Sequence, residues 1–466
     1  MIKVYYDESP AGAGKTERAI NNIVKSSCRT IFVTERKESF PEIDERIRKS
    51  ASIMGTSPFI AHIHGDMECL GRSVSKAVAE VPDRYAGIDH VIVIITHAAL
   101  LTSDFSGFAG WQIVIDEVPA FLDFEEKTTH LDSAYFSRYY HLEHVSDDWC
   151  MVTATTSGVA LSVADVRADD SHSHLDVFHA RVLDASRPNS GRYVLCNLPD
   201  WAAMEERKVK WCWASTFSLR ELAAFERIEL LGNRFRSDIG SMLTRFFDGD
   251  EVEWEPLPPL PNLRQSVKRS VLIHYFSDRQ AAKSFFGGDK GQSALREIGK
   301  YLATVLPTGS SIWSANDTAV HGQPTPKKVL GLPADDYISP KQAGTNRFSK
   351  LSDAAIIYAA KPCPNLRGLL LALKIDPAAW TRTIEHEAIL QFVTRTSVRD
   401  PANATAVNLY VFDREQAEYL RAYFEDLAHV EVVVSQIPLT VAIPPKSKGG
   451  RPPTIRSPQE QAKWLQ

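Results

Sequence analysis

The sequence lacks the cysteine spacing of a disulfide framework or a zinc module. Its 466 residues include six cysteines, and no two of them form a Cys-x-x-Cys pair. Disulfide-rich scaffolds and zinc modules depend on closely spaced cysteines, so the sequence argues against both classes. We therefore expect reduced cysteines and a cytoplasmic location.

The sequence also lacks a long hydrophobic run and an excess of positive charge. Its longest apolar stretches, such as 91–95 and 354–360, are far shorter than a membrane-spanning helix of about 20 residues. Charges begin at Lys3, which is not typical of a signal segment. We expect no membrane partner. The 53 basic and 58 acidic residues give a net charge of −5, so any polyanion site must be a local basic surface.

The remaining composition is that of a globular protein with several domains. Hydrophobic residues make up 44% of the chain, and a length of 466 residues predicts two to four domains. In the first third, strand patterns at 2–6 and 30–33 alternate with a helical pattern at 16–25. The β-branched runs 91–95 and 113–115 are typical of strands buried on both faces of a parallel sheet. This alternation predicts an α/β domain with a doubly wound sheet.

Two later regions divide the chain. Strand and turn patterns such as 140–154, 177–182 and 192–196 predict a β-rich lobe at about 132–207, inserted into the first domain. Four prolines in residues 255–262 predict a linker, because proline fits poorly inside helices and sheets. The predicted organisation is a first domain at 1–255, a linker at 256–267, a second α/β domain at 268–440 and a flexible basic tail at 441–466.

A glycine-rich loop follows the first strand pattern. The letters SPAGAGKT occupy residues 9–16 between a strand and a helix, which is the setting of a phosphate-binding loop. Two glycines let backbone N–H groups face phosphate oxygens, and the lysine and threonine suit the β and γ phosphates and Mg²⁺. We expect ATP and Mg²⁺ here. The expected contacts are Ser9, which replaces the usual first glycine, Gly12, Ala13, Gly14, Lys15 and Thr16.

An acidic pair follows a second buried strand. In WQIVIDEVP, Asp116 and Glu117 lie at the carboxyl end of the strand pattern 113–115, where doubly wound sheets bind ligands. Asp116 can hold Mg²⁺ through water, and Glu117 can polarise the water that attacks the γ-phosphate. The alternative for this pair alone is a solvated acidic turn.

Together, SPAGAGKT and IDEVP resemble motifs I and II of the superfamily 2 helicases, the DExx or DEAD-like ATPases. IFVTER at 31–36, which contains Thr34, resembles motif Ia, and Thr96 with His97 resembles a segment that touches the nucleic-acid backbone in that family. GTNRF at 344–348, which contains Thr345 and Asn346, resembles motif V. The resemblance covers about residues 1–435 and is closest to phage and plasmid helicases.

Two motifs depart from the family pattern. Motif III has two candidates, 214–216 and 153–156, and we favour 214–216 because a helix pattern and then a strand pattern follow it. QFVTRTSVR at 391–399 resembles motif VI, but Arg395 and Arg399 are four residues apart instead of three. On a helix, both spacings place the two arginines on one face.

The resemblance implies two tandem RecA-like domains with parallel sheets. Gln391, Arg395 and Arg399 of the second domain would face the nucleotide, so that ATP hydrolysis is coupled to domain closure and to movement along, or unwinding of, a nucleic acid. DNA is favoured over RNA as the partner. Thr34, Thr96, His97, Thr345 and Asn346 would contact its phosphates, with loop capping as the alternative.

Several alternatives remain at this point. The chain could be the ATPase motor of a DNA-packaging or nuclease complex, a nucleotide-dependent scaffold, or a P-loop kinase or signalling NTPase. Trp149, Trp211 and Trp213 are candidates for base stacking, although such residues are more often core. The tail segment 446–453 resembles minor-groove DNA-binding arms, with a solubilising tail as the alternative.

Overall fold

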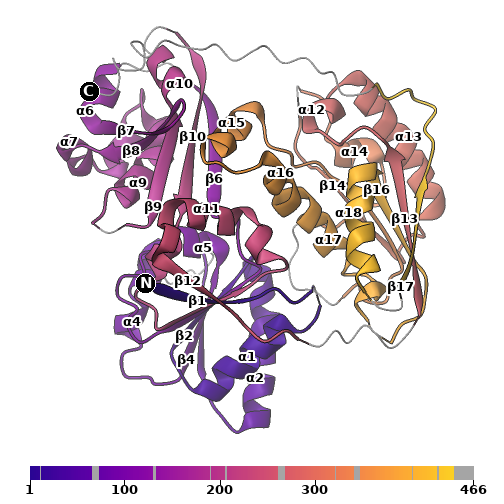
Figure 1. Cartoon of the computed structure of the whole chain (residues 1–466), viewed down its shortest axis with the longest axis horizontal. Coiled ribbons are helices and arrows are strands. Elements are labelled where there is room, and N and C mark those ends of the chain that lie inside the picture. The colour runs from indigo at the N-terminus through magenta and orange to yellow at the C-terminus, as the bar shows by residue number, and fades with distance from the viewer. Residues whose placement is uncertain are drawn as a thin grey trace.

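A computed structural model shows three bodies, each built on one β-sheet (Figure 1). Within the described residues, no helix is both long and apolar enough to cross a membrane. The structure describes residues 1–10, 12–65, 73–129, 133–188, 190–204, 207–260, 268–320, 322–340, 347–400, 402–427 and 430–444.

The first sheet has seven parallel strands whose order brings distant segments together. The order is β12 (Val252–Pro256), β1 (Ile2–Asp7), β11 (Arg227–Leu231), β5 (Gln112–Asp116), β2 (Thr30–Thr34), β4 (Val91–Thr96) and β3 (Phe59–Ile63). Strand β11 therefore lies between β1 and β5, and the carboxyl ends of these three strands are neighbours. The associated helices are α1 (Lys15–Ser26), α2 (Phe40–Met54), α3 (Val74–Ala79), α4 (Val81–Arg84), α5 (His97–Thr102) and α11 (Ile239–Asp248).

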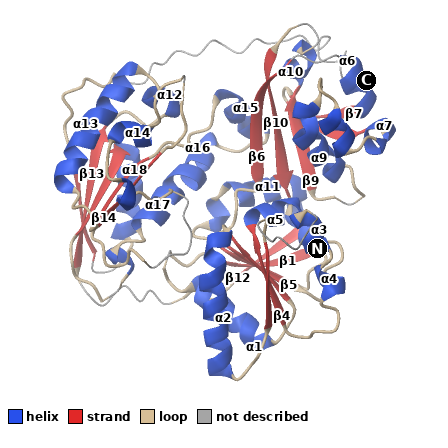
Figure 2. Cartoon of the chain, turned by 180° about the vertical axis from the view of Figure 1, so that it is seen from behind, coloured by secondary structure: helices blue, strands red, loops and turns tan. Residues whose placement is uncertain are grey.

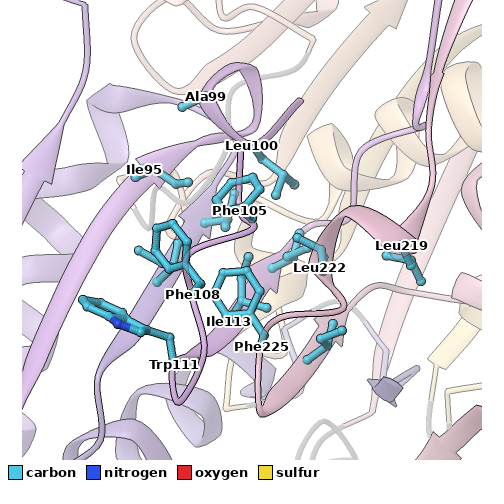
Figure 3. Close-up of a cluster of buried hydrophobic side chains, with 14 of the residues drawn as sticks. Ile95, Ala99, Leu100, Phe105, Phe108, Trp111, Ile113, Leu219, Leu222 and Phe225 are labelled. Carbon is cyan, nitrogen blue, oxygen red and sulfur yellow. The ribbon is translucent and has the colours of Figure 1, made fainter. Parts of the chain in front are cut away.

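Both faces of this sheet are buried. One face packs against α1 and α2, and Ile94 points to that side. The other face packs against an aromatic cluster in which the rings of Phe108 and Phe225 lie 5.1 Å apart, and Ile95 points to it (Figure 3). Because successive strand residues face opposite sides, a run of apolar residues such as 91–95 serves both cores.

The second sheet is antiparallel and forms the insertion lobe, residues 122–217. Its order is β6 (Leu122–Thr129), β10 (Val209–Phe217), β9 (Arg192–Asn197), β8 (Trp149–Ala154) and β7 (Tyr140–Ser146). The chain enters and leaves at one point, because Phe217 N donates to Phe121 O at 3.0 Å. The helices of the lobe are α6 (Ser133–Tyr139), α7 (Thr156–Ala160), α8 (Val163–Ala168), α9 (Asp176–Ala185) and α10 (Leu198–Ala203).

The lobe differs from its sequence-based description in two ways. The sheet begins about ten residues before the predicted range 132–207 and ends about ten residues after it, because β6 and β10 are paired strands of this sheet. The segment 177–182 was expected to be a strand but belongs to helix α9. Phe178 and Val182 are buried four residues apart, which is the spacing of a helix face.

The third sheet has five parallel strands. The order is β14 (Ser311–Ala315), β15 (Asp353–Ile357), β16 (Val407–Asp413), β13 (Arg269–Ser277) and β17 (Val430–Gln436). One hydrophobic cluster lies on each face, so this sheet is also covered on both sides. The helices are α12 (Lys283–Phe286), α13 (Asp289–Val305), α14 (Pro326–Leu330), α15 (Pro364–Ala372), α16 (Pro377–Trp380), α17 (Glu387–Val393) and α18 (Arg414–Glu425). The predicted fold class, two parallel-sheet α/β domains with a β-rich insertion in the first, is confirmed.

Helix α15 leaves the second domain and packs on the insertion lobe, as both views show (Figures 1 and 2). Leu366, Leu369 and Leu370 of this helix join one buried cluster with Trp149 and Leu195 of the lobe. The second domain also contacts the first domain at α11, where Ile239 N donates to Thr383 Oγ1 at 3.1 Å.

Candidate active site

The glycine-rich loop is built as a backbone cradle before α1. Gly12 and Gly14 have φ angles of 76° and 96°, in the left-handed region that glycine adopts without strain. Helix α1 begins at Lys15, and no side chain caps its amino terminus. The first N–H groups of the helix therefore remain available to an anion, and the helix dipole favours negative charge there.

The Lys15 ammonium lies inside this cradle. Its Nζ donates to Ser9 O at 2.5 Å and to Pro10 O at 3.2 Å. Burial lowers the pKa of Lys15, while the negative charges of Asp7 and Asp116 oppose that shift. The ammonium is thus held inside the cradle by two loop carbonyls, which are acceptors that an anionic oxygen can replace.

Thr16 and Asp116 meet across the sheet edge. The Thr16 hydroxyl donates to both carboxylate oxygens of Asp116, at 3.1 and 3.0 Å. Burial and the neighbouring Glu117 raise the pKa of Asp116 to about 7. The raised pKa means that the negative charge of Asp116 is poorly stabilised by its surroundings. A hydroxyl and a carboxylate in contact are oxygen ligands that Mg²⁺ uses beside a triphosphate, so these residues fit the ion.

Glu117 has an unusual backbone. Its φ is 56°, and its N–H donates to Leu231 O at 2.9 Å. Its Oε2 is buried without a hydrogen-bond partner in the structure. A left-handed non-glycine residue costs on the order of 1 kcal/mol and is concentrated at functional sites. Glu117 therefore brings a carboxylate oxygen without a hydrogen-bond donor to the cavity described below.

The second domain supplies arginines to the same cavity. Helix α17 ends at Val393, so Arg395 and Arg399 do not share one helix as predicted. A tight turn still brings both to the cavity, because Arg395 Nε donates to Gln391 O at 3.1 Å and Arg399 ends a 3₁₀ turn. Arg395 is 4% exposed, and its Nη1 is buried without a partner.

Burial lowers the pKa of Arg395, and the negative charge of Glu117 opposes this shift. The guanidinium therefore lies close enough to the Glu117 carboxylate of the first domain for the two charges to interact. The cavity itself measures about 230 Å³. Its lining includes Gly12, Gly14, Lys15, Thr16, Thr34, Asp116, Glu117, Asn233, Asp238, Glu387, Gln391, Arg395 and Arg399.

The structure adds a contact between the domains that the sequence interpretation missed. Asn233 follows β11, and its Nδ2 donates to the two carboxylate oxygens of Glu387 on α17 at 3.2 and 3.1 Å. Burial raises the pKa of Glu387. The strand pattern 227–231 followed by Gly232-Asn233 was the available signal, since it repeats the arrangement of a buried strand and then a polar turn.

Neither of the two motif III candidates lines the cavity. Segments 214–216 and 153–156 lie in or next to β10 and β8 of the antiparallel lobe, away from the residues that line the cavity. In the parallel sheet, β11 lies between β1, which leads into the glycine-rich loop, and β5, which ends at the acidic pair. Asn233, which follows β11, is therefore next to both the loop and the pair. Strand order, which local sequence does not reveal, decides this point.

Other predicted contacts have different surroundings. Ser9 is buried and does not line the cavity: its Oγ accepts from Leu260 N at 3.1 Å and its carbonyl accepts from Lys15. Ala13 also lies outside the lining. Thr34, which was predicted to contact a nucleic acid, lines the same cavity as Lys15 and Asp116.

The Thr96 hydroxyl accepts from Ala99 N at 3.2 Å and caps α5. The His97 ring is buried, and its Nε2 lies 2.9 Å from Asp116 O, so the histidine positions Asp116 and is not free to contact a nucleic-acid backbone. Thr345 and Asn346 lie outside the described residues. The three tryptophans suggested for base stacking are core residues: Trp149, Trp211 and Trp213 are at most 3% exposed.

The chain matches no protein-family model and no curated protein sequence. Among solved structures it is similar to an XPD helicase, with a TM-score of 0.45 and 12% identity over 94% of this chain and 96% of that one. It is also similar to Xpd4 from S. tokodaii, with a TM-score of 0.39 and 11% identity over 93% and 96% of the two chains. It is also similar to Dbp5 from S. cerevisiae bound to RNA and ADP BeF3, with a TM-score of 0.35 and 9% identity over 94% of this chain and 85% of that one. Because these TM-scores are below 0.5, the case for function depends on the strand order and the cavity.

Proposed function

We propose that the protein is an ATP-dependent nucleic-acid translocase or helicase. One observation supports this most strongly: Lys15 and Thr16 of the first domain and Arg395 and Arg399 of the second line a single cavity. A triphosphate that contacts both sets favours the closed arrangement, and loss of the γ-phosphate weakens it. Hydrolysis is thereby coupled to relative movement of two domains, which is the requirement for a motor.

In this proposal the first domain binds the triphosphate and activates water. The Lys15 ammonium exchanges its loop carbonyls for β and γ phosphate oxygens. Glu117 uses its carboxylate oxygen to orient the attacking water and accept its proton. Mg²⁺, when bound by Thr16 and Asp116, would neutralise charge on the β and γ phosphates.

The second domain completes the site. The Arg395 guanidinium, which has an unpaired Nη1, stabilises the negative charge that develops on the γ-phosphoryl oxygens. Gln391 and Arg399 line the same wall. The Asn233–Glu387 hydrogen bonds join the domains at the cavity and break when they separate. In this proposal, residues 1–255 and 268–440 act as the two domains, joined by a linker at 256–267.

ATP hydrolysis with and without nucleic acid tests this function. We expect single-stranded DNA or RNA to stimulate steady-state turnover, with DNA the stronger activator. Lys15→Ala and Glu117→Gln should each lower turnover by more than about a hundredfold, because each removes a group that acts on the transferred phosphoryl. Lys25→Ala, an exposed lysine in the last turn of α1, is the matched control and should retain turnover. Turnover that no nucleic acid changes would contradict the proposal.

A further inference from the structure

Glu387 on α17 accepts hydrogen bonds from both domains. Asn233 of the first domain donates to its two carboxylate oxygens, at 3.2 and 3.1 Å. From its own domain, the Tyr419 hydroxyl on α18 donates to Glu387 Oε1 (Figure 1). We call the cavity that Lys15 and Arg395 line the interdomain cavity. Glu387 lines it and Tyr419 does not, so Tyr419 reaches this cavity through Glu387.

The hydroxyl of Tyr419 remains a donor over the pH range in which enzymes are assayed. Burial raises the pKa of Tyr419, and the negative charge of Glu387 raises it further. The proton therefore stays on the phenol oxygen, and the carboxylate is the acceptor. The ring is also held in place, because it packs against the core cluster on one face of the third sheet and lies 4.8 Å from the His386 imidazole.

The charge of Glu387 depends on its two donors. Burial raises the pKa of Glu387, and the Tyr419 hydroxyl opposes this shift most, followed by Asn233. The cations Arg234 and Lys15 also lower the pKa of this carboxyl group. A hydrogen bond to the charged form of a carboxyl group favours that form. Loss of the Tyr419 hydroxyl would therefore leave Glu387 less ionised near neutral pH and less restrained.

An acid of the first domain lies close enough to Glu387 for their charges to repel. This acid is Asp238, the N-cap of α11, which also lines the interdomain cavity. Burial raises the pKa of Asp238, and the charge of Glu387 adds to this shift. Ser241 N donates to Asp238 Oδ1 at 2.8 Å, whereas Glu387 relies on Tyr419 and Asn233. Two neighbouring carboxylates remain ionised only when such donors hold them.

A second contact between the same two segments is weaker. Arg234, which follows Asn233, forms an ion pair with Asp426 at 3.5 Å, and its guanidinium lies 5.8 Å from the centroid of the Tyr419 ring. The side chains of Arg234 and Asp426 are 42% and 76% exposed, so water screens their charges and the pair contributes little. Hydrogen bonds to a partly buried charge are stronger. The contact of Asn233 with Glu387 is therefore the more important of the two.

We propose that Tyr419 is a positioning residue for ATP hydrolysis: its hydroxyl holds the Glu387 carboxylate in place for Asn233. The contact then favours the closed arrangement in which Arg395 acts. This inference rests on the proposed function, because it requires hydrolysis that depends on domain closure. Without the hydroxyl, the first domain still binds the triphosphate, but closure must also order and charge the carboxylate. The effect is therefore expected on kcat and not on KM.

Steady-state ATP hydrolysis by the full chain with single-stranded DNA, measured between pH 7 and pH 9, tests the inference. At pH 7, Tyr419→Phe should lower kcat by on the order of tenfold, because the closed state loses a hydrogen bond to a charged group. KM for ATP should change by less than about twofold. The loss in kcat should shrink as pH rises to 9, since Glu387 then regains its charge without Tyr419.

A double-mutant comparison with Glu387→Gln isolates the pair. The glutamine amide does not titrate in this range, so adding Tyr419→Phe to Glu387→Gln should change kcat by less than about twofold at either pH. Tyr301→Phe is the matched control, because Tyr301 is a half-buried tyrosine of the same domain that packs against the cluster on the opposite face of the third sheet. It should leave kcat and its pH dependence unchanged.

The outcomes separate this inference from the proposed function. Wild-type kcat in Tyr419→Phe, or equal losses from this change with and without Glu387→Gln, would overturn the positioning role and leave the proposed function intact. A loss that is equal at both pH values and comes with a lower Tm would also overturn it, by assigning the hydroxyl to the fold alone. Hydrolysis that no nucleic acid changes would contradict the proposed motor, while basal turnover would still decide the role of Tyr419. Wild-type protein that hydrolyses no ATP would reject both.

Discussion

The second domain meets the first half of the chain through a polar contact at the cavity that Lys15 and Arg395 line, and through a mainly apolar contact at the lobe, where Asn365 Nδ2 also donates to Glu126 Oε1 at 3.0 Å. At the cavity, Asn233 bonds to Glu387, and Ile239 N donates to Thr383 Oγ1 at 3.1 Å. At the lobe, Leu369 of α15 is fully buried in a mixed cluster. Polar contacts exchange readily with water and contribute about 1 kcal/mol each, whereas a buried leucine contributes about 1.5–3 kcal/mol.

This difference predicts that the contact at the cavity opens more easily than the contact between α15 and the lobe. We expect the cavity contact to form and break with the nucleotide, while α15 and the lobe stay packed. Helix α16, whose Ala379 joins the apolar cluster, runs directly into the π-helical segment Thr381–His386, whose Thr383 makes the polar contact. The junction of these two segments is therefore the expected hinge. Three predictions test the comparison.

The largest effect is expected at the polar contact. Arg395→Ala should lower kcat for ATP hydrolysis by about a thousandfold, because an arginine that stabilises the γ-phosphoryl charge contributes on the order of 10³ or more. ATP binding, measured with a fluorescent analogue, should remain. Arg296→Ala, an exposed arginine of α13, is the control. Wild-type turnover in Arg395→Ala would remove this residue from the site.

A smaller effect, on stability, is expected at the apolar contact. Leu369→Ala should lower the free energy of unfolding by about 2–5 kcal/mol, because it leaves a cavity between α15 and the lobe. Urea unfolding followed by circular dichroism measures this change. Leu371→Ala on the same helix is the matched control, since Leu371 is 53% exposed and should change stability by less than about 0.5 kcal/mol. Equal losses in both variants would mean that α15 does not depend on the lobe.

The smallest effect is expected at the hinge and depends on pH. Burial, with help from the cations Lys361 and Arg382, lowers the pKa of His386 from 6.5 to about 4. Its acidic neighbour Glu385 lies 4.0 Å from Nε2, and the ring of Tyr419 lies 4.8 Å from the imidazole. Because the unfolded chain binds the proton more tightly, the stability from neutral His386 is full above pH 6.5 and is lost as pH falls towards 4.

The free energy of unfolding should therefore fall by about 2 kcal/mol between pH 7 and pH 5 because of this residue. Urea unfolding at both pH values measures the difference. His386→Leu, which cannot take up a proton, should reduce the pH dependence by that amount. An unchanged pH dependence in His386→Leu would assign the effect to other groups.

The predictable parts of the site were those set by neighbouring residues. Gly12, Gly14 and Lys15 lie between a strand and a helix, and Asp116 and Glu117 follow a buried strand, so local pattern was enough to place them. The surroundings of Thr34 and His97 could not be predicted, because they depend on what packs around them, whereas the expectation that the three tryptophans are more often core than stacking residues agrees with their burial. The helix α9 was misread because Phe178, Ala180 and Val182 alternate as in a strand, while Phe178 and Val182 are also spaced as on a helix.

The sequence by itself determined the phosphate loop, the acidic pair and the alternation that makes two parallel sheets, because backbone conformation and burial period are local properties. Only the tertiary structure decided that β11 lies between β1 and β5, that Asn233 therefore meets Glu387, and that α15 covers the lobe. These contacts join residues more than 100 positions apart, and their pairing follows from the combined burial of three sheets, which no single segment specifies.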